Sequence, residues 1–253
     1  MFIDSHCHLE DELINNTQTL NQINNDKDLF SVITLGTDIV SSKKAIDFAK
    51  KYSKVYACVG IHAENAEQWN EQSLNDLEIL AKQNKVVAIG EIGLDYHYNK
   101  ENKSLQTKIF IEQIKLAYKL KLPICIHCRD AVEDVYEILK SNISYLKYGA
   151  VMHCFCETES WAKKFCELGL FISFAGNFTY KGYDKNVAKK VPLNKILIET
   201  DSPYLSPVPF RGQINTPVNV KLVAQELSKV LEIELNEISK ITTDNAKRFY
   251  NIK

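Results

Sequence analysis

The side chains of this sequence that are best suited to chemistry are histidines and carboxylates that follow short apolar runs. Six of them occupy equivalent places in the chain: His6, His8, Glu91, His127, His153 and Asp201. The carboxyl ends of parallel strands meet at one face of a barrel, so residues in such places can converge on one point. Imidazole and carboxylate groups together are typical ligands of divalent metal ions. We therefore expect a metal site.

The first part of this site is predicted from the spacing of two histidines. His6 and His8 lie two residues apart on an extended segment, so their side chains project to the same side and can hold one ion together. Asp201 follows the last apolar run, and it would lie beside them if the first and last strands were neighbours in a closed barrel. The three residues are expected to hold one ion.

A second ion is expected at the ends of the next strands. His127 and His153 follow consecutive apolar runs and would lie side by side. Glu91 could bridge both ions, because a carboxylate has two oxygens and can span metals about 3.5–4 Å apart. Each of these residues taken alone could be a hydrogen-bonded structural group. Their shared position on several strands favours the metal site, with zinc, manganese or magnesium as the ion.

The elements that would position these groups alternate between strand-like runs and amphipathic helical stretches. Eight apolar runs are found, at residues 2–3, 32–35, 55–59, 86–89, 124–126, 150–152, 170–172 and 196–198. Continuous β-branched runs are typical of strands that are buried on both faces of a parallel sheet. Eight strand–helix units in 253 residues predict a single TIM (β/α)8 barrel over residues 1–253, with the metal site at its C-terminal mouth. A doubly wound sheet fits less well, because no G-x-G-x-x-G follows the first strand.

Composition narrows the class of partner. The formal net charge of -1 argues against a protein that coats long stretches of nucleic acid.

The seven cysteines are an odd number, and the first residues resemble no secretory signal, so we expect a reduced, cytoplasmic protein. No segment is apolar for the ~18 residues that a membrane helix needs.

Four further residues are candidates for substrate contacts. His62 ends the third strand-like run, and Tyr204 follows Asp201 in the loop after the last run. Arg129 and Arg211 are two of only three arginines in the chain, and a guanidinium suits bidentate contacts with phosphate or carboxylate. Each could instead be structural: a hydrogen-bonded histidine, a packed tyrosine or an arginine in a surface ion pair.

Seven short motifs distributed over the chain resemble those of the TatD family of metal-dependent deoxyribonucleases, within the amidohydrolase-like TIM barrels. They are FIDSHCHL at 2–9, VGIH at 59–62, GEIGLDY at 90–96, PICIHCR at 123–129, MHCF at 152–155, ETDSPYL at 199–205 and T-x-N-A-x-R-F at 243–249. The resemblance implies metal ligation by the same six residues. It departs from the family pattern after His62, where Ala63 and Glu64 replace the usual proline and histidine; this puts the substrate range in doubt.

The activity implied by the resemblance is hydrolysis of DNA phosphodiester bonds, at ends or in single strands, by a metal-activated water. Asp201 would orient that water or accept its proton, and Glu91 is its catalytic partner as the bridging ligand. Asp95 and Glu199 are expected to orient the ligands. Two alternatives stay open: an amidohydrolase-like enzyme that cleaves amide, lactone or phosphotriester bonds, and a metal-binding protein without catalysis.

Overall fold

The computed structural model describes residues 1–98 and 100–253, which form one eight-stranded parallel sheet surrounded by helices. The strands are β1 (Phe2–Cys7), β2 (Leu29–Leu35), β3 (Val55–Val59), β4 (Val86–Asp95), β5 (Ile124–Arg129), β6 (Ala150–Met152), β7 (Phe171–Phe174) and β8 (Ile196–Ile198). The α-helices are α1 (Asn16–Asn25), α2 (Ile39–Lys51), α3 (Ser73–Ala81), α4 (Lys103–Leu120), α5 (Val132–Ser141), α6 (Glu159–Glu167), α7 (Val220–Leu231) and α8 (Leu235–Tyr250). Short 3-10 helices include η1 (Ala63–Gln68) and η4 (Gly176–Thr179).

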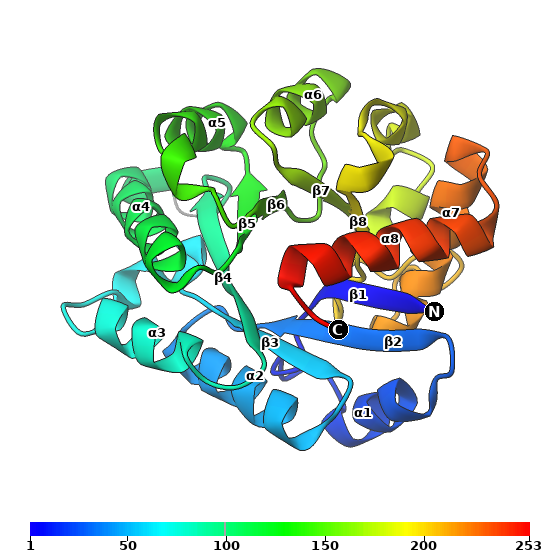
Figure 1. Ribbon diagram of the computed structural model, residues 1–253, viewed down its shortest axis with the longest axis horizontal. Helices are drawn as coiled ribbons and strands as arrows, with labels where there is room; N and C mark the ends of the chain where they lie inside the picture. The colour runs from blue at the N-terminus through cyan, green and yellow to red at the C-terminus, as the bar shows by residue number, and fades with distance from the viewer. Residues whose placement is uncertain (99) are drawn as a thin grey trace.

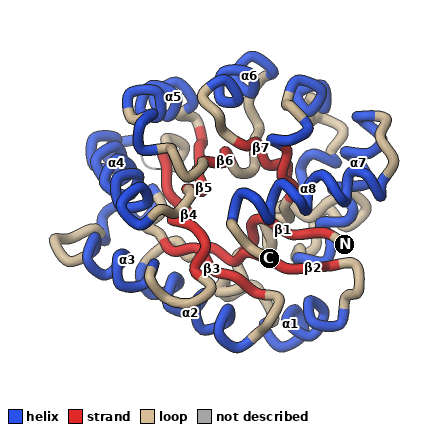
Figure 2. The backbone as a smooth tube through the Cα atoms, viewed as in Figure 1, coloured by secondary structure: helices blue, strands red, loops and turns tan. Residues whose placement is uncertain are grey.

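The strands follow one another around the sheet in chain order, which confirms the predicted TIM barrel. Figures 1 and 2 show the strands in the centre and the helices in a ring outside them. Backbone hydrogen bonds just beyond the ends of β1 and β8 link the first and last strands. The His8 N–H donates to the Ser202 carbonyl at 2.7 Å, and the Asp201 N–H donates to the His6 carbonyl at 3.0 Å. These bonds bring His6 and His8, near the start of the chain, next to Asp201, near its end.

The core has two layers. The larger layer lies between the sheet and the surrounding helices, and the smaller one joins residues of the strands to the end of α8. Figure 1 shows α8 lying across the β1 side of one end of the barrel. From α8, the buried Tyr250 hydroxyl donates to the Ser5 carbonyl of β1 at 2.8 Å and lies 3.3 Å from the Cys125 sulfur of β5. The C-terminal helix thus covers the amino-terminal end of the barrel, which we call the floor.

One boundary differs from the sequence expectation in a way that matters for the site. The fourth strand was expected to end with its apolar run at Ile89, but β4 continues to Asp95. It continues because its backbone pairs with β5 beyond a register shift, with Gly93 opposite His127. A side chain at Gly93 would place its Cβ 2.0 Å from the His127 carbonyl oxygen, so only glycine allows this close approach. Glu91 therefore lies within a strand and not at its end.

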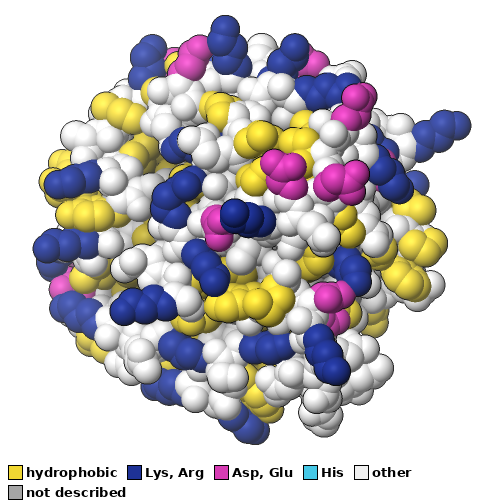
Figure 3. All heavy atoms as spheres, turned by 45° about the vertical axis from the view of Figure 1, so that its right-hand side comes forward, with side chains coloured by type: hydrophobic (Ala, Val, Ile, Leu, Met, Phe, Trp, Pro, Cys, Tyr) yellow, Lys and Arg dark blue, Asp and Glu magenta, His cyan; other side chains and the backbone are white. Residues whose placement is uncertain are grey.

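The helices form where the apolar periodicity predicts them. In α4, Phe110, Ile114 and Ala117 are buried against the sheet, and the helix ends at Leu120, three residues before Pro123. Within the described residues, no helix is long and apolar enough to cross a membrane. The surface in Figure 3 carries lysine and arginine side chains spread among acidic and apolar ones, so this face has no continuous basic patch.

Candidate metal centre

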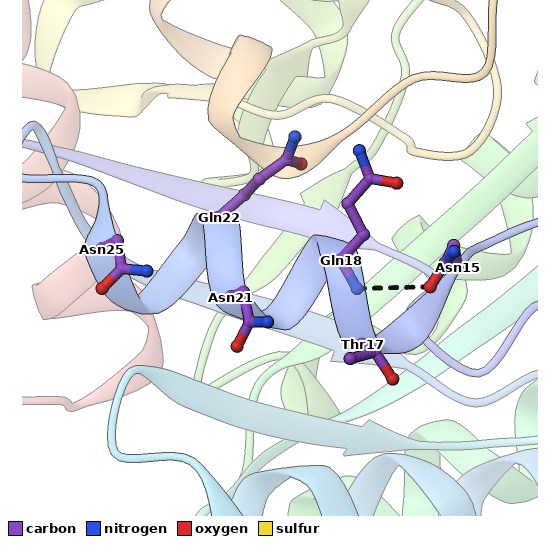
Figure 4. A pocket seen from close by; sticks show the side chains of 6 residues that line it. All are labelled: Asn15, Thr17, Gln18, Asn21, Gln22 and Asn25. Carbon is purple, nitrogen blue, oxygen red and sulfur yellow. Dashed lines mark hydrogen bonds between the residues drawn. The ribbon is translucent and has the colours of Figure 1, made fainter.

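Two concave surfaces differ sharply in the chemistry they offer. One lies along α1 and is lined by Asn and Gln amides and one Thr hydroxyl (Figure 4). It contains no titratable or nucleophilic group other than that hydroxyl. The other is a cavity of about 1190 Å³ at the mouth of the barrel, lined by histidines and carboxylates from the ends of several strands. The mouth is therefore the candidate site.

Glu91 lies at the centre of the mouth cavity, and its two carboxylate oxygens face different pairs of histidines. Oε2 is 3.3 Å from His6 Nε2 and 3.4 Å from His8 Nε2. Oε1 is 2.9 Å from His127 Nδ1 and 2.8 Å from His153 Nε2. Glu91 is 3% exposed. One buried carboxylate thus contacts two pairs of nitrogen donors, and His153 of the second pair also lies close enough to His6 and Asp201 to share an ion with them.

Asp201 completes the first group. Its Oδ1 lies 3.7 Å from His6 Nε2 and 3.6 Å from His8 Nε2, and those two nitrogens are 3.1 Å apart. Donor atoms that bind one ion at about 2.0–2.1 Å lie about 3.0–3.4 Å from each other. The observed spacing is close to this value, so the donors present fit a bound divalent ion. In the second group, His127 Nδ1 and His153 Nε2 are 3.4 Å apart, which fits equally well.

The outward nitrogens of three histidines are held by acceptors, which fixes the proton on that side of each ring. His8 Nδ1 lies 2.9 Å from the Leu35 carbonyl, His127 Nε2 lies 2.9 Å from Asp95 and His153 Nδ1 lies 3.2 Å from Glu199. When such a ring is neutral, its one proton lies on the outward nitrogen, and the inward nitrogen then has a lone pair for an ion in the cavity. Such outer partners are typical of histidines that bind metals.

His62 has the opposite arrangement. Its Nδ1 accepts the Glu64 backbone N–H at 3.1 Å, because His62 caps the amino end of η1. Neutral His62 must then carry its proton on Nε2, which faces Glu91 Oε1 at 3.5 Å. The positions of the nitrogen and oxygen atoms alone would allow His62 to share an ion with Glu91 and His127. The cap bond makes it a hydrogen-bond donor toward the cavity instead.

Burial and the crowding of charges shift the protonation equilibria of the centre. Burial by itself would raise the pKa of Glu91, but nearby His153, His62 and His6 hold this pKa well below the usual range. The pKa of Asp201 is also lowered, since the His8 hydrogen bond and the neighbouring histidines outweigh its burial. Both carboxylates are therefore ionised at neutral pH and available to bind cations.

The residues that orient the ligands were predicted only in part. Asp95 and Glu199, expected to orient ligands, lie within hydrogen-bond distance of His127 and His153. Glu10 was missed: its Oε1 is 3.1 Å from His8 Nδ1, and its Oε2 accepts the Thr34 hydroxyl at 2.7 Å. Strand alternation does not predict it, because β1 ends at Cys7 and Glu10 lies in the turn that follows.

The four candidate substrate contacts lie at different places around the mouth. Arg129 and Tyr204 line the cavity, as His62 does. The Arg129 guanidinium lies over the Tyr98 ring at 4.7 Å, and the Arg211 guanidinium over the Tyr180 ring at 4.5 Å. Arg211 does not line the cavity itself and lies on the loop after β8. Glu64, which replaces the usual family residue, also lines the cavity and is exposed.

Comparison with known proteins shows which family the chain belongs to. The model of the family described as TatD related DNase matches residues 3–251. The chain belongs to the TatD family. It is 38% identical to the uncharacterized metal-dependent hydrolase YabD of Bacillus subtilis, with all of both chains covered. It is 34% identical to the uncharacterized metal-dependent hydrolase YcfH of Escherichia coli K12, over 99% of this chain and 96% of that one. The protein is thus a metal-dependent hydrolase of this family.

Solved structures agree with this assignment at the level of the whole chain. The crystal structure of YjjV, a TatD homologue from Escherichia coli K12, superposes with a TM-score of 0.93 at 28% identity and covers 100% of this chain and 98% of that one. The organophosphorus hydrolase of Deinococcus radiodurans has a TM-score of 0.65 at 10% identity, covering 98% and 92%. The second likeness shows the shared barrel fold alone.

Proposed function

We infer that this TatD protein hydrolyses phosphodiester bonds of DNA and that it does so with two divalent ions. The observation that carries the inference is the position of Glu91, whose two oxygens each face a separate group of histidine nitrogens. A bridging carboxylate is typical of paired metal sites that act on phosphoryl groups. The description of the matching family as a DNase supports DNA as the substrate.

The proposed ligand set divides at Glu91. His6, His8 and Asp201 would hold one ion, and His127 and His153 the other, with Glu91 shared. Bound divalent ions would supply Lewis acidity toward the phosphoryl oxygens and would acidify a water molecule. Manganese, magnesium and zinc all suit mixed imidazole and carboxylate ligands.

The protein's own side chains would then perform the remaining steps. Asp201 is ionised and 13% exposed at its side chain, so it can orient the attacking water or accept its proton. His62 presents Nε2–H to the cavity and can donate a hydrogen bond to an oxygen of the substrate. Arg129 lies at the mouth, where its guanidinium is held over Tyr98 and can contact a phosphate.

A second candidate function has one observation in its favour. The cavity is lined by eight carboxylates: Glu10, Asp11, Glu12, Glu64, Glu91, Asp130, Glu157 and Asp201. Apart from histidines, Arg129 is the one basic side chain among its described lining residues. Such a cavity would also admit a neutral ester or amide, as an amidohydrolase-like enzyme requires. The position of the Glu91 carboxylate between two pairs of histidines favours the nuclease.

The test is an assay of three substrates with one variant and one control. Metal-loaded protein is incubated with end-labelled single-stranded DNA, a phosphotriester and an N-acyl amino acid. We expect nucleotide release from DNA, loss of that release in Asp201→Asn, and no change in Asp47→Asn, which alters an exposed carboxylate of α2. Asparagine accepts the left-handed backbone of residue 201, so the variant removes charge without straining the chain. Cleavage of the ester or amide alone would establish the second function.

A further inference from the structure

The rim of the mouth is divided into two sectors of opposite character. Acidic side chains line the cavity from the loops that follow β1, β3, β5 and β6: Glu10, Asp11, Glu12, Glu64, Asp130 and Glu157. The loop after β8 begins with Glu199 and Asp201 of the metal centre, and the loop after β7 continues to Asp184; the stretches inside these limits, residues 175–183 and 202–219, contain no acid. The charged side chains of these two segments are Lys181 and Arg211. We call these two loops the β7–β8 sector.

The β7–β8 sector also exposes large apolar and aromatic side chains. Tyr204 is 46% exposed, Val208 50%, Phe210 40% and Ile214 58%. Surface apolar residues grouped beside a site commonly mark an interaction surface. The sector is continuous with the cavity, because Asn177 and Tyr204 belong to it and line the cavity wall.

Hydrogen bonds between the two loops hold this surface in place. The Val208 N–H donates to the Thr179 hydroxyl at 2.9 Å, and the Tyr180 hydroxyl donates to the Ser206 carbonyl at 2.9 Å. At Gly176 an added Cβ would lie 1.8 Å from the Leu205 carbonyl oxygen, so the loops pack too closely for a side chain there. The exposed groups are therefore presented by a preorganised surface, which lowers the entropy cost of binding.

The side chains of the β7–β8 sector suit a single-stranded nucleic acid better than those of the acidic loops do. Phosphates that extend beyond the cavity would meet carboxylates on the acidic loops and would be repelled there. In the β7–β8 sector they would meet Arg211, whose guanidinium lies 4.5 Å from the centre of the Tyr180 ring. Flat aromatic and guanidinium surfaces stack on nucleobases, and each stacked base contributes about 1–3 kcal/mol. Bases paired in a duplex are not free to stack in this way.

We propose that a single strand of nucleic acid leaves the catalytic cavity across the β7–β8 sector, with unpaired bases stacked on Phe210 and on the Arg211–Tyr180 pair. The proposal rests on the proposed function, since it places the rest of a substrate whose phosphodiester bond lies at the metal centre. It also explains how a chain with a net charge of -1 and an acidic mouth can bind a polyanion.

The first arm of the test measures hydrolysis with two substrates. Phe210→Ala should raise KM for an oligodeoxythymidylate about tenfold, as expected for the loss of one stacked base. The same variant should raise KM for a small chromogenic phosphodiester, which is too short to reach Phe210, by less than twofold. The matched control is Tyr118→Ala, an exposed tyrosine of α4 (38% exposed) away from the cavity lining.

The second arm measures binding without hydrolysis. The anisotropy of a fluorescent phosphorothioate oligothymidylate gives Kd at several salt concentrations. Arg211→Gln should weaken binding and reduce the slope of log Kd against log salt by about 0.7, the value for one phosphate contact on a single strand. A duplex of the same length should show no dependence on Phe210.

The outcomes separate the two claims. If the wild type cleaves DNA and Phe210→Ala behaves like Tyr118→Ala in both KM and Kd, the strand path is wrong and the proposed function stands. If the wild type binds the oligothymidylate in a Phe210-dependent way but cleaves no DNA, the proposed function is wrong and the surface stands. Equal weakening of the single strand and the duplex by Phe210→Ala would overturn the stacking.

Discussion

At the mouth of the barrel, buried histidines and carboxylates face one another, whereas at the floor lysines bind backbone carbonyls. Lys85 immediately precedes β4, and its ammonium lies 2.7–2.9 Å from four carbonyl oxygens, those of Ala49, Tyr52, Ser53 and Val55. Lys54 precedes β3, and its ammonium lies 2.6–3.1 Å from three carbonyl oxygens between the last turn of α1 and the first residue of β2. Each lysine thus links the start of its own strand to the segment that leads into the preceding strand.

The difference lies in whether each end satisfies its own polar groups. The floor lysines find acceptors within the chain. At the mouth, the inward nitrogens of four histidines, His6, His8, His127 and His153, crowd around the single carboxylate of Glu91. Such an arrangement costs free energy unless ions fill it. The mouth is therefore built for a ligand and the floor for stability, which is the usual division in this fold.

The largest expected effect tests the mouth. Glu91→Gln keeps the shape of the side chain but removes the charge that both groups of histidines share. We expect turnover to fall by about 10²–10³-fold, the size seen when a single electrostatic stabiliser is removed from an active site. The measurement is kcat on the DNA substrate of the wild type, with circular dichroism to show that the fold is retained. A variant with more than a tenth of the wild-type kcat would remove Glu91 from the catalytic machinery.

A smaller effect is expected one step away from the ions. Glu199 accepts the Cys154 N–H at 2.8 Å and lies 3.2 Å from His153 Nδ1. Glu199→Gln should weaken metal affinity by about 10–100-fold, the usual cost of losing such a partner. Isothermal titration with Mn²⁺ measures it, and the partly exposed Glu159→Gln of α6 is the control. Equal affinity in both variants would show that Glu199 does not orient His153.

The pH dependence of the mouth should have opposite signs with and without metal. Burial alone would lower the pKa of His153, but Glu91 and Glu199 raise it well above 6.5. In the metal-free protein this contributes stability that is fully present below pH 6.5 and is lost as pH rises through the raised pKa. Metal binding needs the neutral ring, so metal affinity should rise over the same pH range. Thermal melts with EDTA and with Mn²⁺ check this; parallel trends would contradict it.

The smallest effect on activity is expected at the floor. Lys85→Met should lower the free energy of unfolding by about 1–3 kcal/mol, because four carbonyls lose a charged donor at a partly exposed site. Activity on a small phosphodiester should stay within twofold of wild type. Urea denaturation measures the loss, with Lys44→Met on the exposed face of α2 as control. A Lys85→Met variant as stable as the control would leave the floor without its proposed role.

Much of the fold could be predicted because buried parallel strands are recorded as apolar runs. The runs at Val55–Val59, Ala150–Met152 and Ile196–Ile198 coincide with β3, β6 and β8. Where polar residues continue a strand, this signal fails. The extension of β4 to Asp95 depends on pairing with β5, a long-range contact that no local pattern contains.

The metal motifs could be predicted for a similar reason: equivalent positions on successive strands must converge. The state of His62 could not. Its tautomer follows from the hydrogen bond with the Glu64 N–H, which forms because η1 begins there. Alternation along one extended segment predicts that His6 and His8 lie on one side, but Glu10 reaches His8 from the turn after β1, which alternation does not predict.

The most direct test of the central claim, a paired metal centre bridged by Glu91, is the number of ions bound per chain. Equilibrium titration of metal-free protein with Mn²⁺, read by electron paramagnetic resonance, counts them. We predict two tightly bound ions in the wild type, with a spectrum broadened by coupling between them, and at most one tightly bound, uncoupled ion in Glu91→Gln. A single ion in the wild type, or two coupled ions in the variant, would contradict the account.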